Sequence, residues 1–254
     1  MTKRVNVLGV GVSVLNLQTA LDEIAAAIRD KRKGYICVTG VHGVMEAQTD
    51  PVFKKILNQS FLCTADGMPM VWMGKIHRHP EMRRVYGPDL MLDVCSWSQK
   101  SPCRHFFYGG APGVADTLAE KLKAKFPKLE VVGTFTPPFR PLNADEERQL
   151  AEMVRAAKPD ILWVGLSTPK QEKFMADYLP KLDSTLMIGV GAAFDFHSGR
   201  VKQAPRWMQR SGLEWFFRLC QEPRRLAARY LINNPIFVMK ILAQLTGLKK
   251  YPME

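Results

Sequence analysis

The sequence predicts an α/β fold that is followed by a basic, amphipathic helical appendage. Short apolar runs rich in β-branched and aromatic residues alternate with segments of helical periodicity. These runs show little polar alternation, which is typical of parallel strands covered by helices on both faces. The last fifth of the 254-residue chain is strongly basic and is also rich in Trp, Phe and Leu. We therefore expect a core at residues 1–198 and an appendage at residues 199–254.

Six apolar runs predict the strands of a mainly parallel, Rossmann-like sheet with helices on both faces. They are residues 35–39, 61–65, 105–108, 130–133, 161–164 and 186–190. Near the start of the chain, residues 5–8 are also β-like. The chain contains neither a Walker A loop nor a G-x-G-x-x-G fingerprint, which disfavours an ATPase or a dinucleotide-dependent oxidoreductase.

The intervening segments carry helix start signals. Residues 19–28 place their apolar side chains on one stripe, as an amphipathic helix does. Further helices are expected to begin at Asp50-Pro51 and at Ala111-Pro112, and capping boxes are expected at residues 143–146 and 168–171. The proline-rich stretch 136–141 predicts a stiff loop, either a boundary between two halves or a lid.

Positive charge is concentrated at the end of the chain. The formal net charge is +12, and residues 200–254 contribute +8 of it, from eleven basic and three acidic residues. Such a balance suits a polyanionic partner: nucleic acid, an anionic membrane or a diphosphate. Polar residues interrupt the apolar region 231–248, which predicts a helix lying on a membrane surface rather than crossing it. Pro223 and Pro235 are each expected to begin a short helix.

Two features bear on the cellular compartment. The first residues lack the long apolar stretch and cleavage site of a signal peptide, so we expect a cytoplasmic protein. The five cysteines are scattered and form no C-x-x-C pair, which favours buried thiols over disulfides or zinc ligands.

Ligands of open parallel sheets bind beyond the carboxyl ends of the strands, so the residues just after each apolar run are the candidates for a site. The polar and glycine residues at these positions are Thr39, His42, Asp66, Gly109, Gly110, Ser167, Thr168, Gly191 and Asp195. Gly109 and Gly110 lead from a strand into a helix. They either present backbone N–H groups to a phosphate or simply make a tight turn, and the spacing does not separate these two interpretations.

Three other side chains have both a structural and a chemical interpretation. Asp66 is either a turn or N-cap residue or a carboxylate that accepts a proton, and spacing alone favours the structural role. Arg84 is a candidate phosphate ligand. Gln171 either closes a capping box or donates to a sugar or base edge.

The sequence contains no Asp-x-Asp pair, the usual carboxylate clamp for a divalent ion beneath a nucleotide-sugar diphosphate. Charge relief at a diphosphate would then come from arginine, lysine and helix N-termini, so we expect no metal and no other cofactor. His77 and His79 lie among basic residues that would repel a cation, and His105 and His197 are expected to be structural.

Several strings, each unspecific alone, occur in order along the chain. They are Val38-Thr39 with Ala47-Gln48-Thr49-Asp50-Pro51, Ala65-Asp66-Gly67-Met68, Gly87-Pro88-Asp89-Leu90, Gly109-Gly110-Ala111-Pro112-Gly113, Val164 to Glu172, Gly189 to Phe196, Arg206-Trp207-Met208-Gln209-Arg210, Gly212-Leu213-Glu214-Trp215 and Glu222-Pro223-Arg224-Arg225. Together they closely resemble the WecG/TagA/CpsF glycosyltransferases over nearly the whole chain.

The resemblance implies an inverting, metal-independent transfer from a UDP-sugar, often of the N-acetylmannosamine type, to an undecaprenyl-diphosphate-linked sugar. It implies Asp66 as general base, Thr39 beside the two sugars, and Arg84 and Gln171 in the pocket. It further implies contacts to the lipid diphosphate from the arginines of the appendage. These are Arg206, Arg210, Arg218, Arg224, Arg225 and Arg229. The expected location is the inner face of the cell membrane, as a peripheral protein.

One segment departs from the resemblance. The family commonly has Asn shortly after the position of Thr39, whereas this chain reads Gly40-Val41-His42, which leaves the donor sugar open and makes His42 a candidate contact. A different class of function, a basic α/β protein that binds nucleic acid, would use the same Arg- and Trp-rich C-terminus. Its basic residues are interleaved with apolar ones and no nucleic-acid motif appears, so we expect no nucleic-acid partner. A homo-oligomer remains open.

Overall fold

The computed structural model describes residues 2–253, and its elements follow the predicted α/β order. The strands are β1 (Arg4–Val7), β2 (Val10–Ser13), β3 (Gly34–Thr39), β4 (Leu62–Ala65), β5 (Arg104–Gly109), β6 (Glu130–Phe135), β7 (Ile161–Gly165) and β8 (Leu186–Gly189). The helices are α1 (Leu17–Arg29), α2 (Val41–Glu46), α3 (Pro51–Gln59), α4 (Met68–Ile76), α5 (Gly87–Trp97), α6 (Val114–Lys125), α7 (Ala144–Ala157), α8 (Lys170–Tyr178), α9 (Ala193–His197), α10 (Arg206–Ser211), α11 (Glu214–Gln221) and α12 (Pro223–Leu245).

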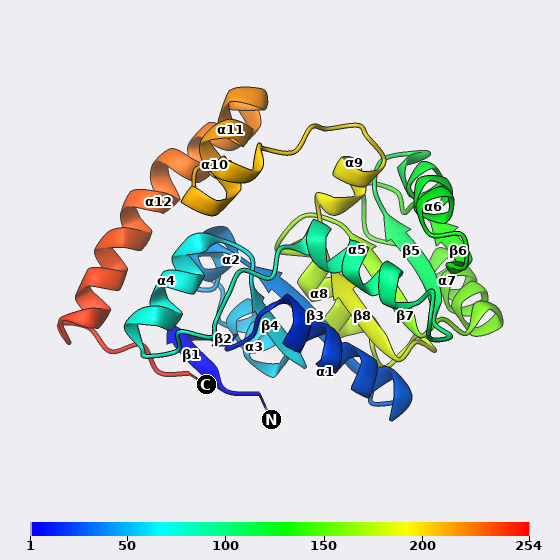
Figure 1. Cartoon of the computed structure of the whole chain (residues 1–254), viewed down its shortest axis with the longest axis horizontal. Helices are drawn as coiled ribbons and strands as arrows, with labels where there is room; N and C mark the ends of the chain where they lie inside the picture. Colours follow the sequence, from blue (N-terminus) through cyan, green and yellow to red (C-terminus); the bar gives the residue numbers. More distant parts are fainter. Residues whose placement is uncertain (1, 254) are drawn as a thin grey trace. The chain divides into compact units, whose positions relative to one another are not determined.

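Six of the strands form one sheet in the order β4-β3-β8-β7-β5-β6 (Figure 1). The pairings β3–β8, β8–β7, β7–β5 and β5–β6 are all parallel. The predicted fold class and all six predicted strands are therefore confirmed. The β-like start of the chain is not part of this sheet, because β1 pairs antiparallel with β2 as a separate hairpin.

The chain divides into two compact units. The first comprises the residues up to Asn16, residues 39–85 and the residues from Lys202 onward, and the second comprises residues 17–38 and 86–201. The proline-rich stretch 136–141 lies inside the second unit, as the loop between β6 and α7. It is therefore not a boundary between halves, because the chain passes between the units at other points.

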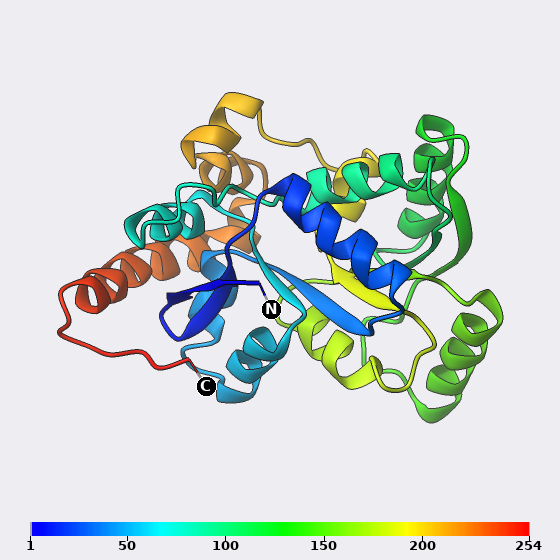
Figure 2. The same ribbon diagram turned by 60° about the horizontal axis from the view of Figure 1, so that its bottom comes forward.

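The second unit is built around the strands β5, β7 and β8. Trp163, Phe106 and Phe107 are fully buried there. The helices α6 and α7 contact β6, α8 contacts β7 and β8, and α1 contacts β8. Figure 2 shows α1 beside α5 on one face of these strands, with α8 on the opposite face. Continuous burial along the strands explains why their sequences lack polar alternation.

His105 and His197 have the structural roles that were expected. The Trp163 indole N–H donates to His105 Nδ1 at 2.9 Å, and His105 Nε2 lies 2.9 Å from Ser98 Oγ. Burial lowers the pKa of His105 to about 4, so this ring is neutral and completes a hydrogen-bonded chain inside the second unit. His197 Nε2 lies 2.9 Å from the carbonyl oxygen of Pro88.

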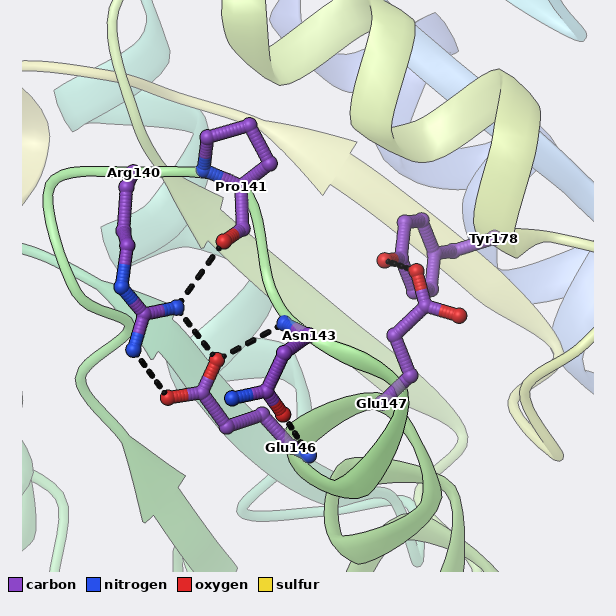
Figure 3. A network of polar contacts seen from close by, with 6 residues as sticks. All are labelled: Arg140, Pro141, Asn143, Glu146, Glu147 and Tyr178. Carbon is purple, nitrogen blue, oxygen red and sulfur yellow. Dashed lines mark hydrogen bonds and ion pairs between the residues drawn. The ribbon is translucent and has the colours of Figure 1, made fainter.

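The capping box of α7 is confirmed (Figure 3). Asn143 Oδ1 accepts from the N–H of Glu146, and Glu146 Oε2 accepts from the N–H of Asn143, both at 2.9 Å. Arg140 donates to both Glu146 oxygens, at 2.7 and 2.8 Å. The Arg140 side chain and the Asn143 backbone N–H lower the pKa of Glu146 to about 2. These contacts tie the proline-rich loop to the start of α7.

Replacing Asn143 with alanine is expected to lower the free energy of unfolding by about 1 kcal/mol, because the first turn of α7 loses a side-chain acceptor. Chemical denaturation of the purified variant measures this difference. Asn143→Asp keeps an acceptor oxygen at the same position and is expected to remain within a few tenths of a kcal/mol of the wild type. If Asn143→Ala had the same free energy of unfolding as the wild type, this cap would not contribute to stability.

Other helix signals were only partly correct. Asp50 caps α3 by accepting from Phe53 N–H at 2.9 Å, as expected. The helix expected from Ala111-Pro112 begins later, at Val114, because Gly113 is the N-cap. The capping box expected at residues 168–171 is wrong, since Pro169 is the N-cap of α8 and makes no side-chain cap. Thr168 instead donates to Glu172.

The C-terminal helices belong to the first unit. Gln244 on α12 accepts from Leu8 N–H at 2.8 Å and donates to the Asn6 carbonyl oxygen at 3.0 Å. Pro235 lies inside α12 and does not begin a new helix, which corrects the prediction of two short helices. Leu226, Phe237 and Ile241 are buried along this helix, so the packing of one continuous face offsets the roughly 3 kcal/mol that an internal proline costs.

The sequence-based expectations for membrane spans and cysteines can be compared with the fold. Between residues 2 and 253, every helix, α12 included, falls short of the length or the apolar character needed to cross a membrane. The cysteines are a separate feature. All five are thiols, and four of them are buried as expected. Cys220 is exposed, which corrects the expectation for that residue because it lies on α11 with no buried face.

Candidate functional site

Thr39 and Asp66 lie next to each other in the first unit, at the ends of β3 and β4. The N–H of Asp66 donates to the carbonyl oxygen of Thr39 at 3.0 Å. A methyl group at Gly40 would lie 3.8 Å from Asp66 Oδ2, so the carboxylate faces the backbone that follows Thr39. The structure therefore brings together the two predicted catalytic residues.

The Thr39 hydroxyl is a buried polar group. The residue is 2% exposed, and within residues 2–253 its Oγ1 has no hydrogen-bond partner. Leaving a buried hydroxyl without a partner costs about 1–3 kcal/mol. A ligand that bonds to this hydroxyl would recover part of that cost, so Thr39 is a candidate contact beside Asp66.

Arg84 connects Asp66 to the C-terminal residues of the same unit. Its Nε donates to the carbonyl oxygen of Asp66, and its Nη2 lies 2.5 Å from Glu214 Oε2. Both side chains of this ion pair are largely buried, at 16% and 13% exposed. Arg84 thus fixes the backbone that carries the Asp66 carboxylate, and it anchors the first turn of α11 on that backbone.

Three predicted arginines, Arg218 on α11 with Arg225 and Arg229 on α12, form what we call the arginine cluster. Partial burial lowers the pKa of Arg229, and the positive charges of Arg218 and Arg225 lower it further. Arg225 is held by Glu222, with a 2.8 Å bond from Nε to Oε1. Like charges at close range are unfavourable unless an anion lies between them, so the cluster is suited to bind one.

Tyr230 of α12 is influenced by charges of both the arginine cluster and Asp66. Burial raises the pKa of its hydroxyl, and the charges that act on it include Arg218, Glu214 and Asp66. The ring packs edge-on against Trp215 at a centroid distance of 5.9 Å. The residues of α11 and α12 therefore share one electrostatic environment with the predicted base.

The other predicted arginines lie apart from this cluster on the surface. Arg206 and Arg210 are exposed on α10, and Arg224 is exposed at the start of α12. Arg206 donates to Gln209 Oε1 at 3.3 Å. Of the six appendage arginines, two are half-buried, Arg218 and Arg229, and four are exposed, Arg206, Arg210, Arg224 and Arg225.

His42, at the departure from the family pattern, lies on the short helix α2. Its Nδ1 is 3.6 Å from Glu46 Oε1, one helical turn away. The side chain is 21% exposed and comes three residues after Thr39. It is therefore close in the chain to Thr39, one of the two predicted catalytic residues.

Gly109 and Gly110 lie in the second unit, at the carboxyl end of β5. Gly109 has a φ of +123°, and a methyl group there would lie 2.7 Å from the backbone of Gly165. The Gly110 N–H donates to the Gly165 carbonyl oxygen at 3.0 Å. Close packing of β5 on β7 thus accounts for Gly109, whereas Gly110 has a φ of +77° and lies against Val114. The Gly110 N–H is already used within the protein.

Gln171 and Asp195 also lie in the second unit. Gln171 is 3% exposed and sits on the first turn of α8, against the end of β8. Asp195 lies on α9, where Arg200 Nη1 is 3.7 Å from its Oδ1. Phe194, next to Asp195, packs against Gly165 and Gly110, so the carboxyl ends of β5, β7 and β8 all lead to these residues.

Sequence reasoning missed Glu214, Tyr230 and Glu172 as residues of the candidate site. Glu214 and Tyr230 meet the Asp66 region only through the fold, so no local pattern could have indicated them. Glu172 had a visible signal, because it follows Gln171 directly at the start of a predicted helix. Among residues 2–253, no group of three or more His, Cys, Asp or Glu side chains is arranged to hold a metal ion.

Comparisons with known proteins identify the family of this chain. The family model described as "Glycosyl transferase WecG/TagA/CpsF family" matches residues 5–251. A relative from Bacillus spizizenii, an N-acetylglucosaminyldiphosphoundecaprenol N-acetyl-beta-D-mannosaminyltransferase, is 29% identical over 227 residues, covering 89% of this chain and 86% of its own length. The Bacillus subtilis protein of the same description is 27% identical over 230 residues, covering 90% of this chain and 87% of its own length. The chain therefore belongs to the WecG/TagA/CpsF family and is a glycosyltransferase.

Proposed function

We propose that this glycosyltransferase moves a sugar from a UDP-sugar to a polyprenyl-diphosphate-linked sugar, with inversion at the anomeric carbon and without a metal ion. The observation that carries the proposal is the position of Asp66 directly beside Thr39, whose buried hydroxyl has no partner within residues 2–253, with Arg84 bonded to the Asp66 backbone. The relatives' names describe transfer of N-acetylmannosamine to an undecaprenyl-diphosphate-linked N-acetylglucosamine. A donor and an acceptor of this chemistry are therefore the first to test.

The proposed chemistry needs one base and a stabilised leaving group. Asp66 takes the proton of the acceptor hydroxyl as that oxygen attacks the anomeric carbon. The bond from this carbon to the donor's diphosphate breaks, and UDP leaves with the electron pair. Because attack and departure occur on opposite faces, the configuration inverts. Arg84 holds the backbone of Asp66, so the carboxylate stays in place during the reaction.

The arginine cluster supports a role in binding the acceptor diphosphate. A diphosphate between these side chains would relieve the repulsion that lowers the pKa of Arg229. The appendage, residues 199–254, carries exposed basic side chains. Its helix α12 also exposes apolar side chains, namely Leu231, Ile232 and Met239. This combination suits contact with an anionic membrane surface. We therefore propose that the appendage holds the enzyme at the inner face of the cell membrane, as a peripheral protein.

Removing divalent cations is expected to leave the initial rate within about twofold of its original value, because arginines rather than a metal would balance the diphosphate charge. The measurement is UDP release before and after treatment with EDTA. The control is repetition with added Mg²⁺ or Mn²⁺. A rate that falls to background with EDTA and returns with either cation would show that a metal takes part.

The donor sugar is tested by a screen of UDP-sugars against a lipid-diphosphate acceptor. His42 stands where the family commonly has Asn, so the screen includes UDP-glucose beside UDP-N-acetylmannosamine. We expect one donor to release UDP far faster than the others. If His42 contributes to this choice, His42→Asn changes the ratio of kcat/KM between donors, and an unchanged ratio would exclude it from donor selection.

A further inference from the structure

Two buried oxygen atoms in the second unit have no partner within residues 2–253. They are Oε1 of Gln171 and Oε2 of Glu172, adjacent residues on the first turn of α8. Gln171 is 3% exposed and Glu172 is 1% exposed. Buried polar atoms are nearly always hydrogen-bonded, so these two neighbouring atoms mark a place where a group outside the chain, a ligand or an ordered water, would bond.

The remaining polar atoms of these two side chains, Glu172 Oε1 and Gln171 Nε2, are hydrogen-bonded within the protein. Glu172 Oε1 accepts from Thr168 Oγ1 at 2.9 Å and from Gln171 Nε2 at 3.0 Å. Because Gln171 Nε2 is used in this bond, its carboxamide cannot rotate without losing it. The orientation of the amide is thus set by Glu172, and that of the Glu172 carboxyl is set in turn by Thr168.

The end of β8 leaves room for the amide. A methyl group at Gly189 would lie 3.1 Å from Gln171 Cδ, and one at Gly191 would lie 3.5 Å from Gln171 Oε1. Side chains at these positions would crowd the amide or cover its oxygen. The glycines keep Oε1 beside the open backbone that follows β8, at the carboxyl edge where parallel sheets bind ligands.

The surroundings of Glu172 favour its neutral form. Burial raises the pKa of this carboxyl, while the hydrogen bonds from Gln171, its own backbone and Thr168 lower it by less. The strands β7 and β8, which pack against α8, carry no charged or titratable side chain. Tyr108 of β5 stacks on Phe174 of α8, and Glu147 of α7 accepts from Tyr178, but neither group is among the causes of this shift. The helix that carries Glu172 bears Lys170, Lys173, Asp177 and Tyr178, none of which is among the causes of this shift. Since Oε1 accepts two hydrogen bonds, a proton on the carboxyl belongs on Oε2.

We propose that Glu172, held by Thr168, is a positioning residue that fixes the Gln171 amide so that its oxygen accepts a hydrogen bond from the UDP-sugar donor. The inference rests on the proposed function, because it takes a UDP-sugar as the ligand. The group recognised is an O–H or N–H of that donor, on either its sugar or its uracil and ribose. In its neutral form Glu172 adds an O–H donor on Oε2, so the pair then offers the ligand one acceptor and one donor.

The test compares substitutions of Glu172 by isothermal titration with two ligands, UDP and UDP-N-acetylglucosamine. Glu172→Gln keeps an oxygen that accepts from Thr168 and Gln171, and its NH₂ group supplies a donor in place of the Oε2 proton. Glu172→Met fills the same space but provides neither the acceptor nor the donor. Glu172→Met is expected to weaken binding about tenfold, and Glu172→Gln to restore most of that loss. Thr168→Val removes one of the two supporting bonds and is expected to cost about threefold.

The two ligands distinguish the sources of the recognised group. A loss with both ligands places it on the nucleotide, and a loss with UDP-N-acetylglucosamine alone places it on the sugar; either result supports the inference. Asp177→Asn, at an exposed acid on the same helix, is the matched control and should bind as the wild type does. Far-ultraviolet circular dichroism and melting temperature verify that each variant is folded.

A pH series separates positioning from a merely structural role. As the pH increases through the raised pKa of Glu172, wild-type affinity should fall, while Glu172→Gln should show no such fall. The melting temperature of the wild type should likewise decline relative to Glu172→Gln as the pH rises from the ordinary pKa of a glutamate to the raised pKa of Glu172, because the unfolded chain releases a proton there that the folded protein retains.

Three results would overturn the inference. They are wild-type affinity in Glu172→Met for both ligands, equal losses in Glu172→Met and Glu172→Gln, and parallel pH profiles for wild type and Glu172→Gln. Failure of the proposed function looks different: the wild type itself would bind neither UDP nor UDP-N-acetylglucosamine. That result would contradict the ligand role of Gln171 as well, while the melting temperatures would still report the protonation of Glu172.

Discussion

Replacing Asp66 with asparagine is expected to lower kcat about 10²–10⁴-fold, because the amide keeps the shape of the side chain but cannot accept a proton from the acceptor hydroxyl. The Asp66 backbone contacts to Thr39 and Arg84 do not involve the carboxylate and should survive. UDP affinity should therefore be close to that of the wild type. Steady-state UDP release and equilibrium titration with UDP measure the two quantities.

The control for this substitution is Glu81→Gln, which neutralises an exposed carboxylate in the same unit and should leave kcat unchanged. The pH profile gives a second check, since the acidic limb of kcat/KM should disappear in Asp66→Asn if that limb reports the base. A variant that turns over at the wild-type rate would remove Asp66 from the mechanism.

Replacing Arg218 and Arg229 together with glutamine is expected to lower kcat/KM for the lipid-linked acceptor roughly 10²–10⁴-fold, at about 1.5–3 kcal/mol for each charge-assisted hydrogen bond lost. The affinity for UDP should change much less, because we assign these side chains to the acceptor diphosphate. A short-chain, water-soluble acceptor used without vesicles keeps membrane attraction out of the measurement. Titration with UDP completes the comparison.

The matched control is Lys240→Gln. This substitution also removes a positive charge from α12, but at a position away from the arginine cluster. It should retain wild-type kcat/KM for the soluble acceptor. Should the double substitution behave like Lys240→Gln, the arginine cluster would have no specific part in acceptor binding.

Elements whose signals are local were well predicted from the sequence. The six strands of the sheet are apolar runs buried on both sides, so each run is visible without knowledge of its neighbours. The same holds for the Asp50 and Asn143 caps, which bond to the backbone three residues away. Strand ends were therefore found as well, and with them the positions of Thr39 and Asp66.

Features decided by tertiary packing were predicted less well. Pro235 carries a strong local signal for a helix start, yet the buried face of α12 continues through it. Thr168 has the side chain of a cap, but its hydroxyl bonds to the buried Glu172 instead. The ion pair of Arg84 with Glu214 joins residues 130 positions apart, and no pattern within either segment encodes that contact.

The central claim, sugar transfer from a UDP-sugar to a lipid diphosphate, is tested most directly by one reaction. The wild-type enzyme is incubated with UDP-N-acetylmannosamine and a polyprenyl-diphosphate-linked N-acetylglucosamine, and both UDP and the lipid product are quantified by mass spectrometry. The account predicts one UDP for each acceptor extended by one sugar, with no release when the acceptor is omitted and none beyond background for Asp66→Asn. Absence of an extended lipid across the UDP-sugar screen, or equal UDP release without acceptor, would contradict it.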